Sequence, residues 1–227
     1  MKKSIKTIAK SGLTASLLLL LAVPSFSQTN KLGLSFNSLT TNFNYGESNS
    51  NLKSHKKNFT GLQVGAIYQA SISERVSVVP ELYFSIKGGT LKANNPLTTD
   101  KTTLRLYSLE APVVARLHLK QLYLNAGPYV AYAMGGRLKT ENSETSEKTK
   151  TVVSFGDDAD DFKRWDFGFQ AGGGYNFNVK RSVLTLDVRY GYGLVNISRD
   201  VERYNRLLNI SLVLSKPAKA GKSDKQS

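Results

Sequence analysis

The stretch QLYLNAGPYVAYAMGGRL, residues 121–138, decides the fold of this 227-residue chain. Taken at every second position, it separates into two sets. One set is apolar: Leu122, Leu124, Ala126, Pro128, Val130, Tyr132 and Met134. The other is small, polar or hydroxylated: Tyr123, Asn125, Gly127, Tyr129, Ala131, Ala133 and Gly135. A period of two is typical of a β-strand. The run exceeds the about five or six residues of a soluble strand and suits a tilted membrane-crossing strand, which needs about nine to eleven. It therefore predicts a transmembrane strand with its apolar face toward lipid.

Seven further stretches show the same alternation, at residues 31–39, 59–70, 76–88, 103–119, 164–179, 182–198 and 205–215. Their connections alternate between short turns and longer polar loops. An even strand number, with long extracellular loops and short periplasmic turns, is typical of outer-membrane barrels. Closure leaves no unpaired sheet edge in lipid. The sequence therefore predicts an all-β fold, an eight-stranded antiparallel up-and-down transmembrane β-barrel.

Three prolines, Pro80, Pro112 and Pro128, fall in the middle of predicted strands. Proline has no N–H to donate to a sheet ladder, and within sheets it is found at edges and bulges. We therefore expect local bulges at these positions.

The N-terminus has the features of a secretory signal peptide. Four lysines precede an apolar stretch at residues 13–23, and Ser25-Phe26-Ser27 forms a small-x-small cleavage site. We predict a cleaved signal peptide at residues 1–27, a barrel domain at residues 28–216 and a basic, disordered tail at residues 217–227. The predicted location is the outer membrane of a Gram-negative bacterium.

Composition narrows the partners and cofactors. The chain has no cysteine, which excludes disulfides and thiolate metal sites. Removal of the four signal-peptide lysines lowers its formal net charge from +14 to +10. Because the chain is exported and its basic residues are scattered, we exclude nucleic acid. We expect the positively charged chain to interact with outer-membrane lipid headgroups and with lipopolysaccharide phosphates.

Seven ionisable residues share the inward set of positions: Glu81, Lys87, Glu110, Arg116, Asp166, Asp187 and Arg189. Side chains just fill the interior of an eight-stranded barrel, and buried charges must be paired. Since both signs are present, we predict an ion network that plugs the lumen. The alternative is a selectivity lining or a proton path.

Aromatic residues gather near the ends of the predicted strands, as in the girdles that flank the apolar band of outer-membrane barrels. The predicted girdle consists of Tyr68, Tyr107, Tyr132, Trp165, Phe177 and Tyr192.

The sequence contains no recognisable catalytic, cofactor or metal site. A hydrolase of the Ser-His-acid type needs all three groups, and neither His55 nor His118 lies beside a nucleophile motif. The four aspartates at residues 157–161 lack the spacing of a calcium loop. They are therefore interpreted as part of a solvated loop. This loop, residues 139–163, is the longest connection, and we expect it to build little core and to serve recognition.

Four segments carry a family resemblance: PELYFSIKG at residues 80–88, LEAPVVARL at 109–117, NAGPYVAY at 125–132 and DVRYGYGLVNI at 187–197. With them the chain resembles the PorT-like outer-membrane β-barrel family, barrels of the OmpA/OmpX type. The resemblance implies a possible role in type IX protein secretion, with secretion-system or cell-surface proteins as partners.

The resulting hypothesis is a small, non-enzymatic outer-membrane barrel that acts through its loops or its periplasmic rim. One alternative is a soluble lipocalin-like barrel, which would carry its apolar face inside and bind an apolar ligand. A second is an outer-membrane lipid-modifying enzyme, which the histidine positions disfavour.

Overall fold

The computed structural model describes residues 30–218, so the predicted signal peptide and all but the first two residues of the predicted tail lie outside the described residues. Eight long strands build the barrel: β1 (Lys31–Asn44), β3 (Phe59–Ser71), β4 (Val76–Leu91), β5 (Lys101–Leu119), β6 (Leu122–Glu141), β8 (Trp165–Val179), β9 (Ser182–Gly193) and β10 (Tyr204–Pro217). The connections contain the short strands β2 (Lys56–Lys57) and β7 (Lys148–Val152) and the 3-10 helix η1 (Ser50–Leu52). Within residues 30–218, no helix is long and apolar enough to cross a membrane.

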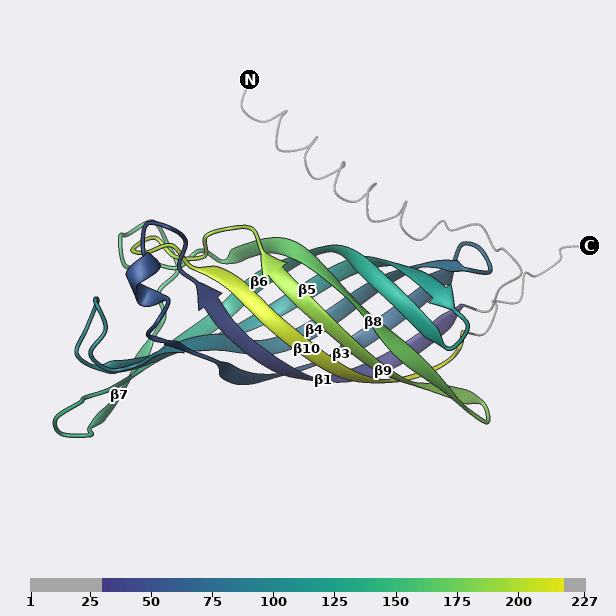
Figure 1. Cartoon of the computed structure of the whole chain (residues 1–227), viewed down its shortest axis with the longest axis horizontal. Coiled ribbons are helices and arrows are strands. Elements are labelled where there is room, and N and C mark those ends of the chain that lie inside the picture. Colours follow the sequence, from purple (N-terminus) through teal and green to yellow (C-terminus); the bar gives the residue numbers. More distant parts are fainter. Residues whose placement is uncertain (1–29, 219–227) are drawn as a thin grey trace, which may run out of the picture.

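The sheet closes on itself. Each long strand pairs antiparallel with the next one along the chain, and β1 pairs with β10 from Lys31↔Pro217 to Asn44↔Tyr204. Figure 1 shows the strands running obliquely across the barrel, with the longer connections at one end and the tight turns at the other. We call these the outer and inner ends. The predicted eight-stranded antiparallel up-and-down barrel is confirmed.

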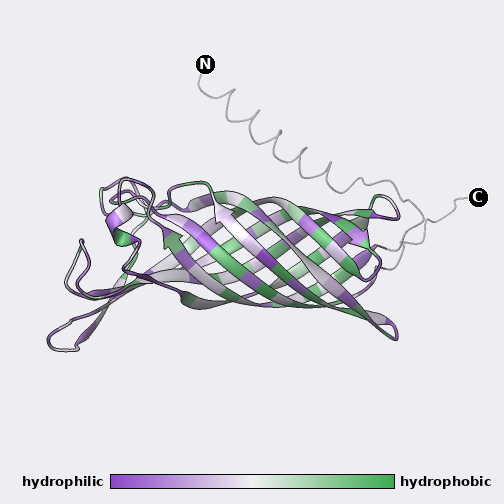
Figure 2. Cartoon of the chain, in the orientation of Figure 1, coloured by the Kyte–Doolittle hydropathy of each residue, from purple (hydrophilic) through white to green (hydrophobic). Residues whose placement is uncertain are grey.

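The two faces of the strands differ as the alternation predicts. Phe36 on the outside is 65 % exposed, whereas Ser35 beside it is 1 % exposed. Figure 2 shows the resulting alternation of hydrophobic and hydrophilic positions along the strands. Large apolar side chains cover the outside of the barrel and charged ones lie within. A soluble lipocalin-like barrel needs the opposite arrangement, so that alternative is excluded.

Two of the inner turns have only two residues, 120–121 and 180–181. Lys120 and Lys180 adopt left-handed backbone angles there, with φ values of 63° and 48°. Non-glycine residues adopt this region mostly in tight turns. The outer connections are longer, and two of the four contain a short helix or strand.

The expectation of bulges at the prolines is wrong. The ladders lose pairs beside Pro80, Pro112 and Pro128, but the register is the same on both sides of each gap. Pro112, for example, pairs with Tyr129 on β6 and lacks a partner on β4. A strand residue donates its N–H to one neighbouring strand only, so proline weakens one ladder and leaves the other intact.

The register shift of β5 and β6 lies instead near the outer end. Tyr107 pairs with Gly135 and Ser108 with Ala133, which leaves Met134 as an extra residue on β6. Such a bulge reverses the inward and outward positions beyond it. Leu138 therefore turns toward the barrel interior, where it packs against the apolar cluster of the outer mouth.

Candidate functional site: the charged interior and the closed outer mouth

The strongest ion pair of the interior crosses the barrel from β4 to β9. The guanidinium of Arg189 donates to both carboxylate oxygens of Glu81, at 2.7 and 2.9 Å. Its Nε also lies 2.7 Å from Oδ1 of Asp187. These strands are not neighbours in the sheet, and all three side chains are buried. Inward-facing residues of β4 and β9 therefore form a bidentate ion pair that connects opposite walls of the barrel.

A second group surrounds the Lys87 ammonium. Nζ of Lys87 lies 2.7 Å from Glu110 and 3.2 Å from Asp166. Gln63 donates to Glu110 at 2.9 Å, and Asn205 donates to Asp166 at 2.7 Å. Five strands, β3, β4, β5, β8 and β10, each supply one of these side chains. Their convergence gives each buried carboxylate both a cation and a neutral donor.

Arg116 lies apart from these ion pairs. Its Nη1 donates to Gln69 at 3.3 Å, and its guanidinium lies 4.0 Å from the centre of the Tyr123 ring. The Tyr123 hydroxyl donates to Asp187, and Asn125 donates to the same carboxylate at 2.8 Å. Arg116 is therefore joined to the network through an aromatic ring and not through a carboxylate.

The structure thus places all seven predicted side chains in the interior, where each is at most 5 % exposed. Neutral partners that the sequence analysis did not single out complete the network. Gln63 is the clearest case, because its Oε1 accepts from Asn37 at 2.6 Å and from Asn209 at 3.1 Å while its amide donates to Glu110. Its inward-facing position in the alternating pattern of β3 was the sequence signal that could have identified Gln63. The arrangement brings four acidic and three basic side chains together within the barrel and joins all of its walls.

Above this layer, the outer loops close the mouth of the barrel with an apolar cluster. The cluster consists of Phe43, Tyr45, Leu52, Leu91, Leu104, Leu106, Val153, Phe162, Ile197 and Val201, with Leu138 and Phe155 packed against it. Val153 and Phe162 come from residues 139–163, so the expectation that this connection builds little core is wrong. Its few apolar residues have no strand or helix period, and only the folded loop brings them together.

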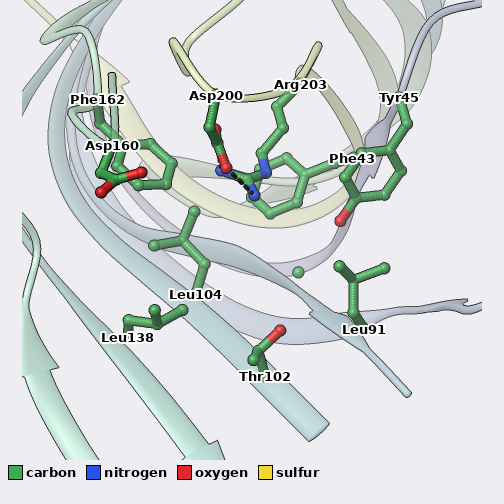
Figure 3. Close-up of a pocket in the computed structure, with 11 residues that line it drawn as sticks. Phe43, Tyr45, Leu91, Thr102, Leu104, Leu138, Asp160, Phe162, Asp200 and Arg203 are labelled. Atoms are coloured by element: carbon green, nitrogen blue, oxygen red, sulfur yellow. Dashed lines mark hydrogen bonds and ion pairs between the residues drawn. The ribbon is translucent and has the colours of Figure 1, made fainter. Parts of the chain in front are cut away.

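A cavity of about 230 Å³ remains within this cap, lined in part by residues of the apolar cluster (Figure 3). Arg203 lines it, donating to both carboxylate oxygens of Asp200 at 3.1 Å while its guanidinium lies 5.2 Å from the Phe162 ring centre. Burial raises the pKa of the nearby Tyr45 phenol, and the charge of Arg203 opposes that rise. Arg203 is thus held by Asp200 within the loop between β9 and β10, and its contact with Phe162 joins this loop to the connection between β6 and β8.

The predicted acidic loop is partly structural. Asp161 is buried and accepts the backbone N–H of Asp158, and Asp157 pairs with Arg199. In the part of the chain that the structure describes, no group of three or more His, Cys, Asp or Glu residues is placed to hold a metal ion.

The two histidines lie far apart, His55 in the first outer loop and His118 at the inner end of β5. Nε2 of His118 is 2.9 Å from Oγ of Ser77, a contact that the sequence analysis missed because the two lie 41 residues apart. Ser77 is 1 % exposed. An acyl substrate therefore has no access to its hydroxyl.

The six aromatic residues of the predicted girdle all point away from the interior. Trp165 packs edge-on against Tyr132, with ring centres 5.0 Å apart, and stacks on Phe167 at 6.0 Å. Phe177 at the inner end packs against Tyr175 at 4.7 Å. Tyr68, Trp165, Phe177 and Tyr192 are exposed, whereas Tyr107 and Tyr132 are half-buried.

Comparison with known proteins agrees with this geometry. A family model described as "Outer membrane protein beta-barrel domain" matches residues 26–199. The chain is similar to Neisserial surface protein A, with 11 % identity over 86 % of this chain and 100 % of that one, and a TM-score of 0.44. It is also similar to Ail of Yersinia pestis, with 10 % identity, 83 % and 99 % coverage and a TM-score of 0.40. OprG from Pseudomonas aeruginosa shows 8 % identity, 84 % and 97 % coverage and a TM-score of 0.40. No curated protein matches the chain in sequence.

Proposed function

Because the chain belongs to the outer membrane protein β-barrel domain family and lies in the outer membrane, we propose that it is a non-enzymatic interaction protein. Its barrel serves as a closed scaffold, and its outer loops are the surface that partners contact. One observation carries the proposal: buried charges of opposite sign pair across the interior, and an apolar cluster lies at the mouth above them, which supports a closed barrel. A barrel closed in this way has its outer surface left for function.

The most prominent part of that surface is the hairpin of β6 and β7. It extends away from the barrel beyond the other loops (Figure 1), and its strands pair from Arg137↔Val152 to Glu141↔Lys148. Every residue of β7 is exposed. Loops held by a rigid scaffold are the usual place for recognition. Leu138 at the base of the hairpin packs against the cap, whereas the exposed residues of β7 do not belong to it, so their charges are free to serve contact with partners.

We propose that the protein is not an enzyme because a substrate cannot reach its candidate catalytic side chains. Ser77 is buried at the inner end, where its hydroxyl contacts the half-buried His118. The carboxylates of Glu81 and Glu110 are engaged by buried cations and neutral donors. A lipid-modifying enzyme needs a nucleophile or base that an acyl chain can reach.

The test is a trimmed hairpin. Replacing residues 140–150 with a four-residue Gly/Ser linker removes the exposed tip and leaves Val153 and Phe162 in the cap. We expect the variant to keep its heat-dependent mobility shift on a gel and to lose proteins that co-purify with the wild type from mild detergent. The matched control replaces the inner turn Lys180-Arg181 with Asn-Gly and should keep those partners. A trimmed variant that assembles and retains every partner would contradict the proposal.

A finer form of the proposal is a PorT-like part in type IX secretion, supported by the four resembling segments. In that case the partners are secretion proteins, and the inner rim is their contact surface. The same experiment separates the two forms, because the Asn-Gly turn variant would then lose partners while the trimmed hairpin would keep them.

A further inference from the structure

In addition to the cavity in the cap, a groove lies on the outside of the barrel at the outer end of β8, with a volume of about 440 Å³. Its upper part is lined by the cationic residues Lys163, Arg164 and Arg199, and its lower part by Trp165 and Phe167. The remaining lining residues are Phe155, Gly156, Asp157, Phe162 and Val195. None of the seven charged interior residues lines this groove, and Phe162 is the one lining residue that it shares with the cavity of Figure 3.

The cations of the groove outnumber its acids. Asp157 is the one carboxylate among the described residues that line it, and it pairs with Arg199. Arg164 is held by the carbonyl of Ala133 at 3.0 Å and lies 4.5 Å from the Phe155 ring centre, but its charge is not neutralised. Among the described residues, none accepts a hydrogen bond from the ammonium of Lys163. The groove therefore carries an excess of positive charge and an unused donor.

The lower wall of the groove faces lipid. Trp165 and Phe167 are 53 % and 44 % exposed on the apolar outside of the barrel, and Trp165 belongs to the aromatic girdle of the outer end. Phe167 lies four positions after Lys163, which is a span of roughly 13 Å along an extended chain. The groove thus places an apolar wall next to a cationic rim, in the same order as the acyl chain and the headgroup of one lipid.

From this geometry we propose that the groove binds a phosphorylated glycolipid of the outer leaflet, of the lipopolysaccharide type. Its phosphate lies against Lys163 and Arg199, and one acyl chain lies along Trp165 and Phe167. Charge complementarity selects an anionic headgroup, and the apolar wall selects an amphiphile over a free anion. This site is independent of the β6–β7 hairpin and of any protein partner.

The chain supplies its own reporter, because Trp165 is its single tryptophan. The purified protein in dodecylphosphocholine micelles is titrated with diphosphoryl lipid A while Trp165 fluorescence is recorded, and bound lipid is counted by native mass spectrometry. We expect a saturable fluorescence change and one retained lipid A molecule. Phosphatidylcholine and inorganic phosphate, titrated separately, should produce neither.

The test variant is Lys163→Gln, which removes the unpaired charge and keeps the backbone hydrogen bond from Lys163 N to Ile197 O. Loss of one charge-assisted hydrogen bond should weaken the apparent Kd for lipid A about tenfold. Lys150→Gln on β7 is the matched control and should bind like the wild type. Three results would overturn the proposal: no lipid A retained, an equal response to phosphatidylcholine or to phosphate alone, or equal weakening by both variants.

Discussion

Single residues in the interior are constrained by their charge more than by their size. Burying an ion is costly, and the cost is offset only if the partner charge and further hydrogen bonds are in place. Arg189 meets this condition with Glu81 on one side and Asp187 on the other. Asp187 in turn keeps Tyr123 and Asn125 as donors. Breaking one of these contacts leaves a charge in a place that water does not reach.

Replacing Glu81 with leucine tests this at the residue scale. Glu81→Leu removes two hydrogen bonds and leaves Arg189 with Asp187 as its one anionic partner. We expect a loss of about 3–5 kcal/mol in the free energy of unfolding, which is typical of a broken buried pair. Urea unfolding in lipid vesicles, followed by Trp165 fluorescence, measures it.

The double variant Glu81→Leu/Arg189→Met is the control. It removes both charges and leaves Asp187 with its neutral donors, so it should recover a large part of the lost stability. If the double variant is less stable than Glu81→Leu alone, the contact between Arg189 and Asp187 stabilises the barrel more than the cross-barrel pair does.

At the scale of the element, each strand has one face toward lipid and the other toward the polar interior of the barrel. On β9, Leu186 is 44 % exposed on the outside and its neighbour Asp187 is 0 % exposed. Leu186 pairs with Leu212 on β10 and with Tyr175 on β8, so it lies within the apolar band. The same alternation tolerates the mid-strand prolines, because each disturbs one ladder without shifting the register.

A charge on the outward face of β9 should therefore be costly. Leu186→Arg places a guanidinium in hydrocarbon, and we expect it to cost about 2–4 kcal/mol of stability in bilayers. Leu186→Ala keeps the surface apolar and should be mild by comparison. Unfolding of both variants in the same vesicles provides the measurement, and a Leu186→Arg variant as stable as wild type would mean that this face does not meet lipid.

At the scale of the whole molecule, the closed ring of strands and the side chains in its interior together determine whether ions can pass. The ring of strands leaves no free edge in the apolar band, and polar side chains from all of its walls are buried in the interior. An eight-stranded barrel is narrow enough for side chains to fill it completely. The cap at the outer mouth adds a second barrier above the ionic layer.

We therefore expect no stable conductance. In planar lipid bilayers the purified protein should show no uniform single-channel steps under conditions where a large porin, used as a positive control, conducts. Persistent and uniform steps would contradict the plugged lumen. They would restore Glu81, Arg116 and Asp187 as candidates for a pore lining.

The sequence by itself determined the strand number, the antiparallel order and the face on which most strand side chains lie, except beyond the bulge at Met134 on β6. These follow from local alternation, which every strand carries in its own residues. The long outer connections and the tight inner turns also followed from local composition. The strand ends shifted by a few residues, most of all on β1, which runs on to Asn44, and on β9, which ends at Gly193.

Only the tertiary structure decided which inward charges meet. Glu81 and Arg189 are 108 residues apart, and their contact depends on the register of every ladder between them and on closure of the ring. Arg116 shares the inward parity of the others but lies against Tyr123, and the bulge formed at Met134 and not at a proline. The cap arose in the same way, since Val153 and Phe162 lie in a polar stretch without a period and become a core only when three outer loops meet the ends of the strands. Alternation in a strand is a local property, whereas contact across a lumen is a property of the closed ring.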